Sequence, residues 1–207
     1  MDLFVSTRPD GSGFYGSPPL APGARCTFDP DVFFAQVPPR ELDPYDGMVV
    51  HESPRDVVAW PCRIWRVTDV GTPVSEHPHL KFSRVRELTG VEEVPSWQFF
   101  GPHGDQVLTI LDQAARLRQE QVDRIAAMDG TRERRLYEKH WDDGWGNSYL
   151  EVHRAVERAA EYRDDEMWRD ARDCAVAAAW GLEQDLYTPA EREVLARRWT
   201  SVMGTHT

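Results

Sequence analysis

The sequence predicts an α+β protein, with a small β-rich domain at residues 1–104 followed by an α-helical bundle at residues 105–207. Two observations predict this division. Fourteen of the fifteen prolines lie at or before Pro102, and proline interrupts both helices and central strands. Beyond Gly104 the apolar residues recur with a period of about 3.6 instead of about 2, which indicates amphipathic helices. We therefore expect the boundary between the two domains at residue 104.

Short β-prone segments alternate with turns in the first domain. A strand is expected at residues 3–6, then a tight turn at 8–11, whose proline and glycine suit turn positions, after which Phe14-Tyr15 resumes the strand. Prolines argue against a central strand or long helix through most of residues 17–46, so we expect an ordered loop anchored by aromatic residues such as Phe28 and Phe33. Further segments complete the domain: strands at 48–51, 62–70 and 82–94, the last bent at Gly90, and a short helix from Ser53.

Four helices are expected in the second domain. Their apolar residues place one long helix over 107–125, ending near 129–130, and others around 149–160, 167–178 and 188–203. The last has the clearest signals, because Thr188-Pro189-Ala190-Glu191 is a capping box with proline at the first helical position, and Gly204 follows its end. Its apolar stripe, which includes Leu195, needs a surface to cover it, so we expect this helix to pack within the bundle.

Composition limits the possible partners and compartments. The net charge is −11, and both halves are acidic, which disfavours direct binding to nucleic acid because that binding depends on clustered cations. The three cysteines have no ligand-like spacing, which is typical of reduced thiols in the cytoplasm. No signal peptide or apolar run of membrane-spanning length is evident in the sequence. We therefore expect a cytoplasmic protein that contacts neither nucleic acid nor membrane.

Common catalytic and ligand-binding motifs are missing from the sequence. It contains no glycine-rich nucleotide loop, no nucleophile elbow and no zinc-protease helix. Two sets of polar residues could be considered as metal ligands. The first is His77 and His79 with His51 and Glu76, and the second comprises the histidines and acids from Glu138 to His153. Neither group has a spacing that makes its ligands converge, so we predict no metal and no cofactor.

Three segments resemble an uncharacterised domain family of actinobacteria and their phages. The segments are Thr7-Arg8-Pro9-Asp10-Gly11, then residues 49–54 leading through Trp60-Pro61-Cys62-Arg63 to Val70-Gly71, and finally Asp185-Leu186-Tyr187-Thr188-Pro189 to Arg198-Trp199. This resemblance spans most of the chain, but the motifs are structural and the family offers no activity to carry over.

Residues 47–97 are also similar to the central region of rifampicin-type ADP-ribosyltransferases. The resemblance implies a related fold and a site for NAD or a related nucleotide, although the histidine expected on the first strand is absent from Val5-Ser6-Thr7-Arg8. It makes Tyr15 and Tyr45 candidates for stacking on the nicotinamide, and Glu76 a candidate for the acid. Arg8 is a candidate for phosphate contact because its guanidinium is a planar fork. A divergent transferase-like domain is therefore one functional hypothesis.

The leading hypothesis from the sequence is a non-catalytic interaction protein of an actinobacterial or phage accessory system, such as host takeover or counter-defence. Its acidic helical half is expected to engage a protein partner, and a narrower version makes that partner a basic nucleic-acid-binding protein. Trp141 and Trp145 flank a turn and are candidate contact residues, because tryptophan is enriched at interface hot spots. The enzyme hypothesis stays open as the alternative.

Overall fold

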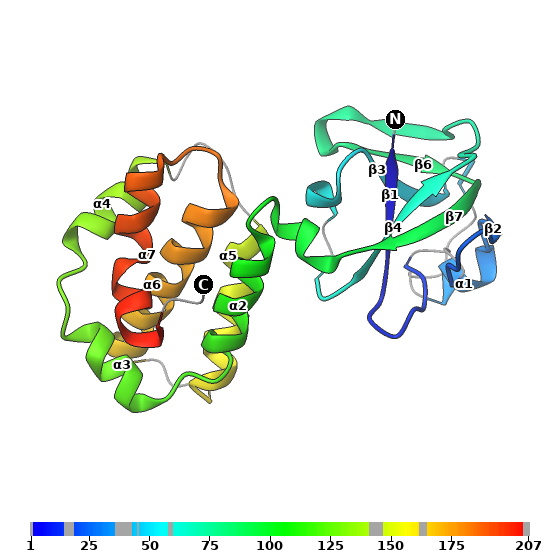
Figure 1. The fold of residues 1–207 in the computed structure, drawn as a ribbon. Helices are drawn as coiled ribbons and strands as arrows, with labels where there is room; N and C mark the ends of the chain where they lie inside the picture. Colours follow the sequence, from blue (N-terminus) through cyan, green and yellow to red (C-terminus); the bar gives the residue numbers. More distant parts are fainter. Residues whose placement is uncertain are drawn as a thin grey trace. The chain divides into compact units, whose positions relative to one another are not determined.

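The computed structural model of the chain describes residues 2–14, 19–35, 43–44, 46–57, 60–140, 147–161 and 165–204. The chain divides into two compact units, Met1–Phe99 and Phe100–Thr207, which we call the sheet unit and the helical unit (Figure 1). The sheet unit contains the strands and the helical unit contains α2 to α7, so the predicted α+β class is confirmed. The two units divide between Phe99 and Phe100, a few residues before the boundary predicted at residue 104.

One antiparallel sheet organises the first unit, with seven strands in the order β2-β7-β4-β1-β3-β6-β5. The strands are β1 (Leu3–Thr7), β2 (Arg25–Thr27), β3 (Met48–His51), β4 (Arg63–Thr68), β5 (Ser75–His77), β6 (Phe82–Val85) and β7 (Glu87–Val94). Three short helical segments lie between strands, namely α1 (Pro30–Phe34) and the 3-10 helices η1 (Pro54–Asp56) and η2 (Pro78–Leu80), and a further 3-10 helix, η3 (Ser96–Phe100), follows β7. The strands predicted at the start of the chain and at 48–51 and 62–70 are therefore present, as is the short helix capped by Ser53.

The sheet is strongly curved, as the connection between β6 and β7 requires. These strands lie four strand positions apart in the sheet, which is roughly 19 Å on a flat sheet. Only Arg86 separates them along the chain, and two residues span at most about 7 Å. The sheet must therefore curl on itself like a partly open barrel. The prediction of a single strand over 82–94 is wrong, because β6 ends at Val85 and β7 begins at Glu87. Between them, the carbonyl of Arg86 accepts a hydrogen bond from Phe28 N at 2.8 Å.

The proline-rich segment of the sheet unit packs against this curved sheet. Phe28 and Phe33 are buried in the same core cluster as Val5, Met48 and Leu88, which confirms the predicted aromatic anchors. The segment also contributes β2, an edge strand that pairs with β7, and the short helix α1. Both elements were missed because prolines and short apolar runs give no clear period.

The pairing of β7 with β4 shifts register at Gly90, between Arg66 and Val67, which agrees with the predicted bend of the strand. Gly90 also allows the proline-rich segment to approach β7 closely. A Cβ atom at position 90 would lie 2.7 Å from the carbonyl oxygen of Ala21, which is a backbone atom with little freedom to move. The glycine carbonyl also accepts a hydrogen bond from Gly23 N at 2.7 Å, and its N–H donates to the Ala24 carbonyl at 2.9 Å. The close contact between these two backbone segments thus depends on the missing side chain.

Gly90→Ala is therefore expected to lower the free energy of unfolding of the sheet unit by about 1–3 kcal/mol, because overpacking forces the backbone apart. Gly71→Ala is the matched control, since a Cβ there would meet Glu87 atoms no closer than 3.6 Å. Urea unfolding followed by circular dichroism measures both variants. Equal stability of the two variants would show that the close approach at Gly90 does not matter.

The helical unit contains α2 (Gly104–Ala114), α3 (Gln119–Ala126), α4 (Thr131–Lys139), α5 (Asn147–Ala159), α6 (Glu166–Glu183) and α7 (Pro189–Met203). The single helix predicted over 107–125 is wrong, because the chain breaks between α2 and α3. Arg118 adopts an extended conformation there, and its N–H donates to the Gln121 side chain at 2.9 Å, which starts a new helix. The predicted helices at 149–160, 167–178 and 188–203 are confirmed as α5, α6 and α7.

The core of the helical unit confirms the predicted packing of α7. The Thr188 hydroxyl accepts a hydrogen bond from Glu191 N, and the Glu191 carboxylate accepts one from Thr188 N, as a capping box requires. Leu195 and Trp199 are fully buried, and Leu195 packs in a cluster with Trp180 and Tyr187. Among the described residues, no helix has the length and apolar character needed to cross a membrane.

Candidate functional site

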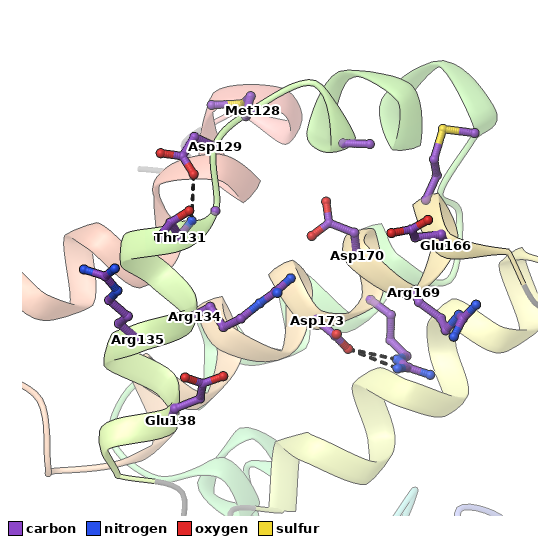
Figure 2. A pocket seen from close by; sticks show the side chains of 14 residues that line it. Met128, Asp129, Thr131, Arg134, Arg135, Glu138, Glu166, Arg169, Asp170 and Asp173 are labelled. Carbon is purple, nitrogen blue, oxygen red and sulfur yellow. Dashed lines mark hydrogen bonds and ion pairs between the residues drawn. The ribbon is translucent and has the colours of Figure 1, made fainter.

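A charged groove lies between α4 and α6 in the helical unit and has a volume of about 860 Å³ (Figure 2). We call it the α4–α6 groove. Its lining comprises Ala126, Met128, Asp129, Gly130, Thr131, Arg134, Arg135, Glu138, Glu166, Met167, Arg169, Asp170, Arg172 and Asp173. Nine of these side chains carry a charge, four positive and five negative. Such a lining suits a charged ligand better than an apolar one.

Helix starts and helical spacing place the charged side chains on the two walls. The Asp129 carboxylate accepts a hydrogen bond from Thr131 N at 2.9 Å, which fixes the start of α4 and lowers the pKa of Asp129. The Asp165 carboxylate accepts from Trp168 N at 2.9 Å and caps α6. Glu166, Arg169 or Asp170, and Asp173 then follow at intervals of three or four residues along α6. Residues with this spacing share one face of a helix, which here forms the second wall.

Arg198 of α7 lies buried next to the groove and holds several helices together. Its guanidinium binds both carboxylate oxygens of Asp170 on α6, with one of the two contacts at 3.2 Å. It also contacts Glu133 Oε1 on α4 at 3.4 Å and donates to the carbonyl of Ile125 on α3 at 2.9 Å. A Cβ atom at Gly130 would lie 2.2 Å from Arg198 Nη1, so only glycine leaves room for this arrangement.

Several charges of the groove remain unpaired within the described part of the chain. Asp173 is paired with Arg172 at 3.1 Å, and Asp170 is engaged by Arg198. By contrast, the described residues provide no hydrogen bond or ion pair for the side chains of Arg134, Arg135, Glu138 or Glu166. Figure 2 shows Arg134 reaching from α4 toward α6, whereas Arg135 lies at the rim. Arg134 on one wall and Glu166 on the other are thus available to a ligand.

The residues predicted as a nucleotide site lie in different parts of the sheet unit. Arg8 follows β1 and is engaged in its own turn, where it donates to the carbonyl of Gly13 at 2.7 Å and stacks over Phe14. Glu76 lies on β5, and β3 and β6 separate that strand from β1 in the sheet. Tyr15 and Tyr45 fall outside the described residues. The nucleotide site inferred from the resemblance stays a prediction.

The structure bears also on the predicted partner contacts and on the two groups of residues considered as metal sites. Trp141 and Trp145, the predicted partner contacts, also fall outside the described residues. Among the residues that are described, no group of three or more histidine, cysteine, aspartate or glutamate side chains could hold a metal ion. His77 on β5 stacks on Phe82 of β6, with ring centroids 4.5 Å apart. His51 lies opposite the same Phe82 on β3, the other neighbour of β6, and its burial lowers its pKa.

The groove itself was missed because α4 was not predicted. Its sequence, Thr131-Arg132-Glu133-Arg134-Arg135-Leu136-Tyr137-Glu138-Lys139, has few apolar residues, and its buried residue is the acid Glu133. A search for apolar periodicity therefore passes over it. The available signal was the density of arginine in a short segment directly after Asp129-Gly130.

Comparisons with known proteins do not add to this description. No protein-family model, no curated protein and no solved structure matches the chain.

Proposed function

We propose that this protein is a non-catalytic interaction protein, and that its helical unit binds a charged segment of a protein partner in the α4–α6 groove. The observation that carries the proposal is the pair of oppositely charged side chains on the two walls, Arg134 and Glu166, which have no ion-pair partner among the residues that the structure describes. The volume of about 860 Å³ is within the range of ordinary ligand sites, so a few side chains of a peptide segment fit.

Charge complementarity defines the segment that the groove would take. A guanidinium binds a carboxylate through two parallel hydrogen bonds, so Arg134 favours an acidic side chain next to α4. Glu166, at the start of α6, favours a basic side chain at the other wall. We therefore infer a segment that carries both charges. The net charge of −11 adds long-range attraction for a partner that is basic as a whole, as the sequence predicts.

The composition of the groove supports binding over catalysis. Its described lining includes no histidine, cysteine or lysine, which are common nucleophiles and general bases. The most enclosed acid of the lining, Asp170, already neutralises Arg198. A charged groove whose most enclosed acid is already paired can hold a ligand, but it offers little for proton transfer.

Arg134→Ala is expected to weaken binding of short mixed-charge peptides about tenfold or more, because a hydrogen bond to a charged group contributes about 1.5–3 kcal/mol. Fluorescence anisotropy with labelled acidic, basic and mixed-charge peptides measures the effect. Arg132→Ala is the matched control, since Arg132 is exposed on the same helix but does not line the groove. Its affinity should equal that of the unmodified protein.

Three outcomes would contradict the proposal. They are no binding of any peptide set, equal binding by the Arg134→Ala and Arg132→Ala variants, and a preference for purely basic peptides that neither variant changes. The last outcome would favour an acidic surface elsewhere on the chain. Because exposed ion pairs are screened by salt, the affinity of the unmodified protein should also fall as the ionic strength rises.

A further inference from the structure

The α4 wall of the groove is attached to the bundle through an ionisable side chain. Glu133 is the buried residue of α4, with 5 % of its surface exposed. The apolar residues Leu136 and Tyr137 of the same helix are only half-buried. An amphipathic surface helix normally buries apolar side chains against its neighbours. Because α4 buries Glu133 instead, the free energy of docking α4 depends strongly on whether this carboxyl group is protonated.

The surroundings of Glu133 only partly satisfy a charged carboxylate. From α7, Arg198 contacts Oε1 at 3.4 Å, and Arg197 adds a weaker positive field. From α6, Asp170 holds the guanidinium of Arg198 with two oxygens and repels a second negative charge. The thiol of Cys174, also on α6, interacts with the Glu133 side chain and stays neutral, because burial raises its pKa. From α3, the carbonyl of Ile125 takes a further N–H of Arg198. Glu133 Oε2 is buried without a hydrogen-bond partner among the described residues.

Two carboxylates thus share one buried guanidinium, and Asp170 has the better contacts. We propose that α4 docks with Glu133 in its neutral acid form, and that ionisation of this side chain loosens α4, so that a change of pH near neutrality opens the wall of the groove. The effect on partner binding rests on the proposed function. The proton-linked docking of α4 does not.

The direction of the effect follows from proton linkage. Burial, opposed by Arg198, raises the pKa of Glu133 from its ordinary value of 4.5 to about 7. The docked helix therefore holds a proton over a range of pH in which the exposed side chain has lost it. Docking is strongest below about pH 4.5, weakens as the pH rises to about 7, and changes little beyond. Between about pH 6 and about pH 8 the docking equilibrium constant should fall about tenfold.

Hydrogen exchange of the α4 amides tests this proposal. After correction for intrinsic exchange rates, the opening constant of α4 should rise about tenfold from about pH 6 to about pH 8 in the unmodified protein. It should be independent of pH in Glu133→Gln, which is neutral and nearly isosteric. Glu138→Gln is the matched control, because Glu138 is exposed on the same helix and should leave the pH dependence intact.

A second measurement needs no variant. Carbon-13 NMR titration of the Glu133 carboxyl in the intact chain should give a midpoint near neutrality. An ordinary midpoint below about 5 would overturn the proposal, as would equal pH dependence of α4 exchange in Glu133→Gln and the unmodified protein. Failure to bind charged peptides would count against the proposed function but would leave these two results unaffected.

Discussion

Replacing Arg198 by alanine is expected to lower the free energy of unfolding of the helical unit by about 3–5 kcal/mol, the usual effect of removing one partner from a buried ion pair. Arg198 is 3 % exposed and contacts groups on α3, α4 and α6 from its position on α7. Its loss leaves Asp170 and Glu133 facing each other without a cation. The same substitution removes the side chain that packs against Gly130.

Denaturant unfolding of the full chain, followed by circular dichroism at helical wavelengths, measures this loss. Arg197→Ala is the neighbouring control, since Arg197 is exposed and its hydrogen bond to the Asp129 carbonyl is long, at 3.3 Å. Exposed interactions of this kind contribute less than about 1 kcal/mol. Arg198→Met, which keeps most of the packing, separates the missing charge from the missing volume. A loss below about 1 kcal/mol in Arg198→Ala would show that the ion-pair cluster does not hold the helices together.

Leu195→Ala is expected to destabilise the same unit by about 2–5 kcal/mol, through lost burial and the cavity that remains. Leu195 is 0 % exposed and packs with Ala177, Trp180 and Tyr187. The site has little room to collapse, because Gly181 on α6 already approaches so closely that a Cβ there would lie 3.0 Å from Leu195 Cδ1.

Leu150→Ala provides the control for Leu195, since Leu150 is also a helical leucine but is 50 % exposed. Its effect should stay within about 0.5 kcal/mol. Thermal unfolding of the two variants gives the comparison directly. Equal midpoints would mean that α7 is not a structural part of the core.

The elements that could be predicted from the sequence have local signals. The capping box at Thr188 and the apolar positions of α5 and α6 depend on residues close together in the chain, and the structure confirms them. The separation of β6 from β7 depends instead on pairing with β3 and β4, which lie far away in the sequence. The close approach at Gly90 also depends on a distant segment, because the backbone of Ala21 leaves no room for a side chain there.

The candidate site could not be predicted for a related reason. Its walls come from residues 126–138 and 166–173, and only the fold brings them together. Glu133 carries the further difficulty that an acid occupies the position where an apolar residue would normally mark the buried face of α4. Composition indicated an acidic protein, yet this groove contains four arginines, so net charge describes the surface as a whole and not the site.

Hydrogen-exchange footprinting of the full chain, with and without a bound mixed-charge peptide, tests the location of the binding site most directly. Added protection is expected at residues 126–138 and 166–173, which line the α4–α6 groove. A second groove, lined by Thr109, Arg116, Gln121 and Met203 among others, serves as the internal control and should not change. Protection confined to that second groove or to the sheet unit, with α4 and the start of α6 unaffected, would contradict the assignment of the site.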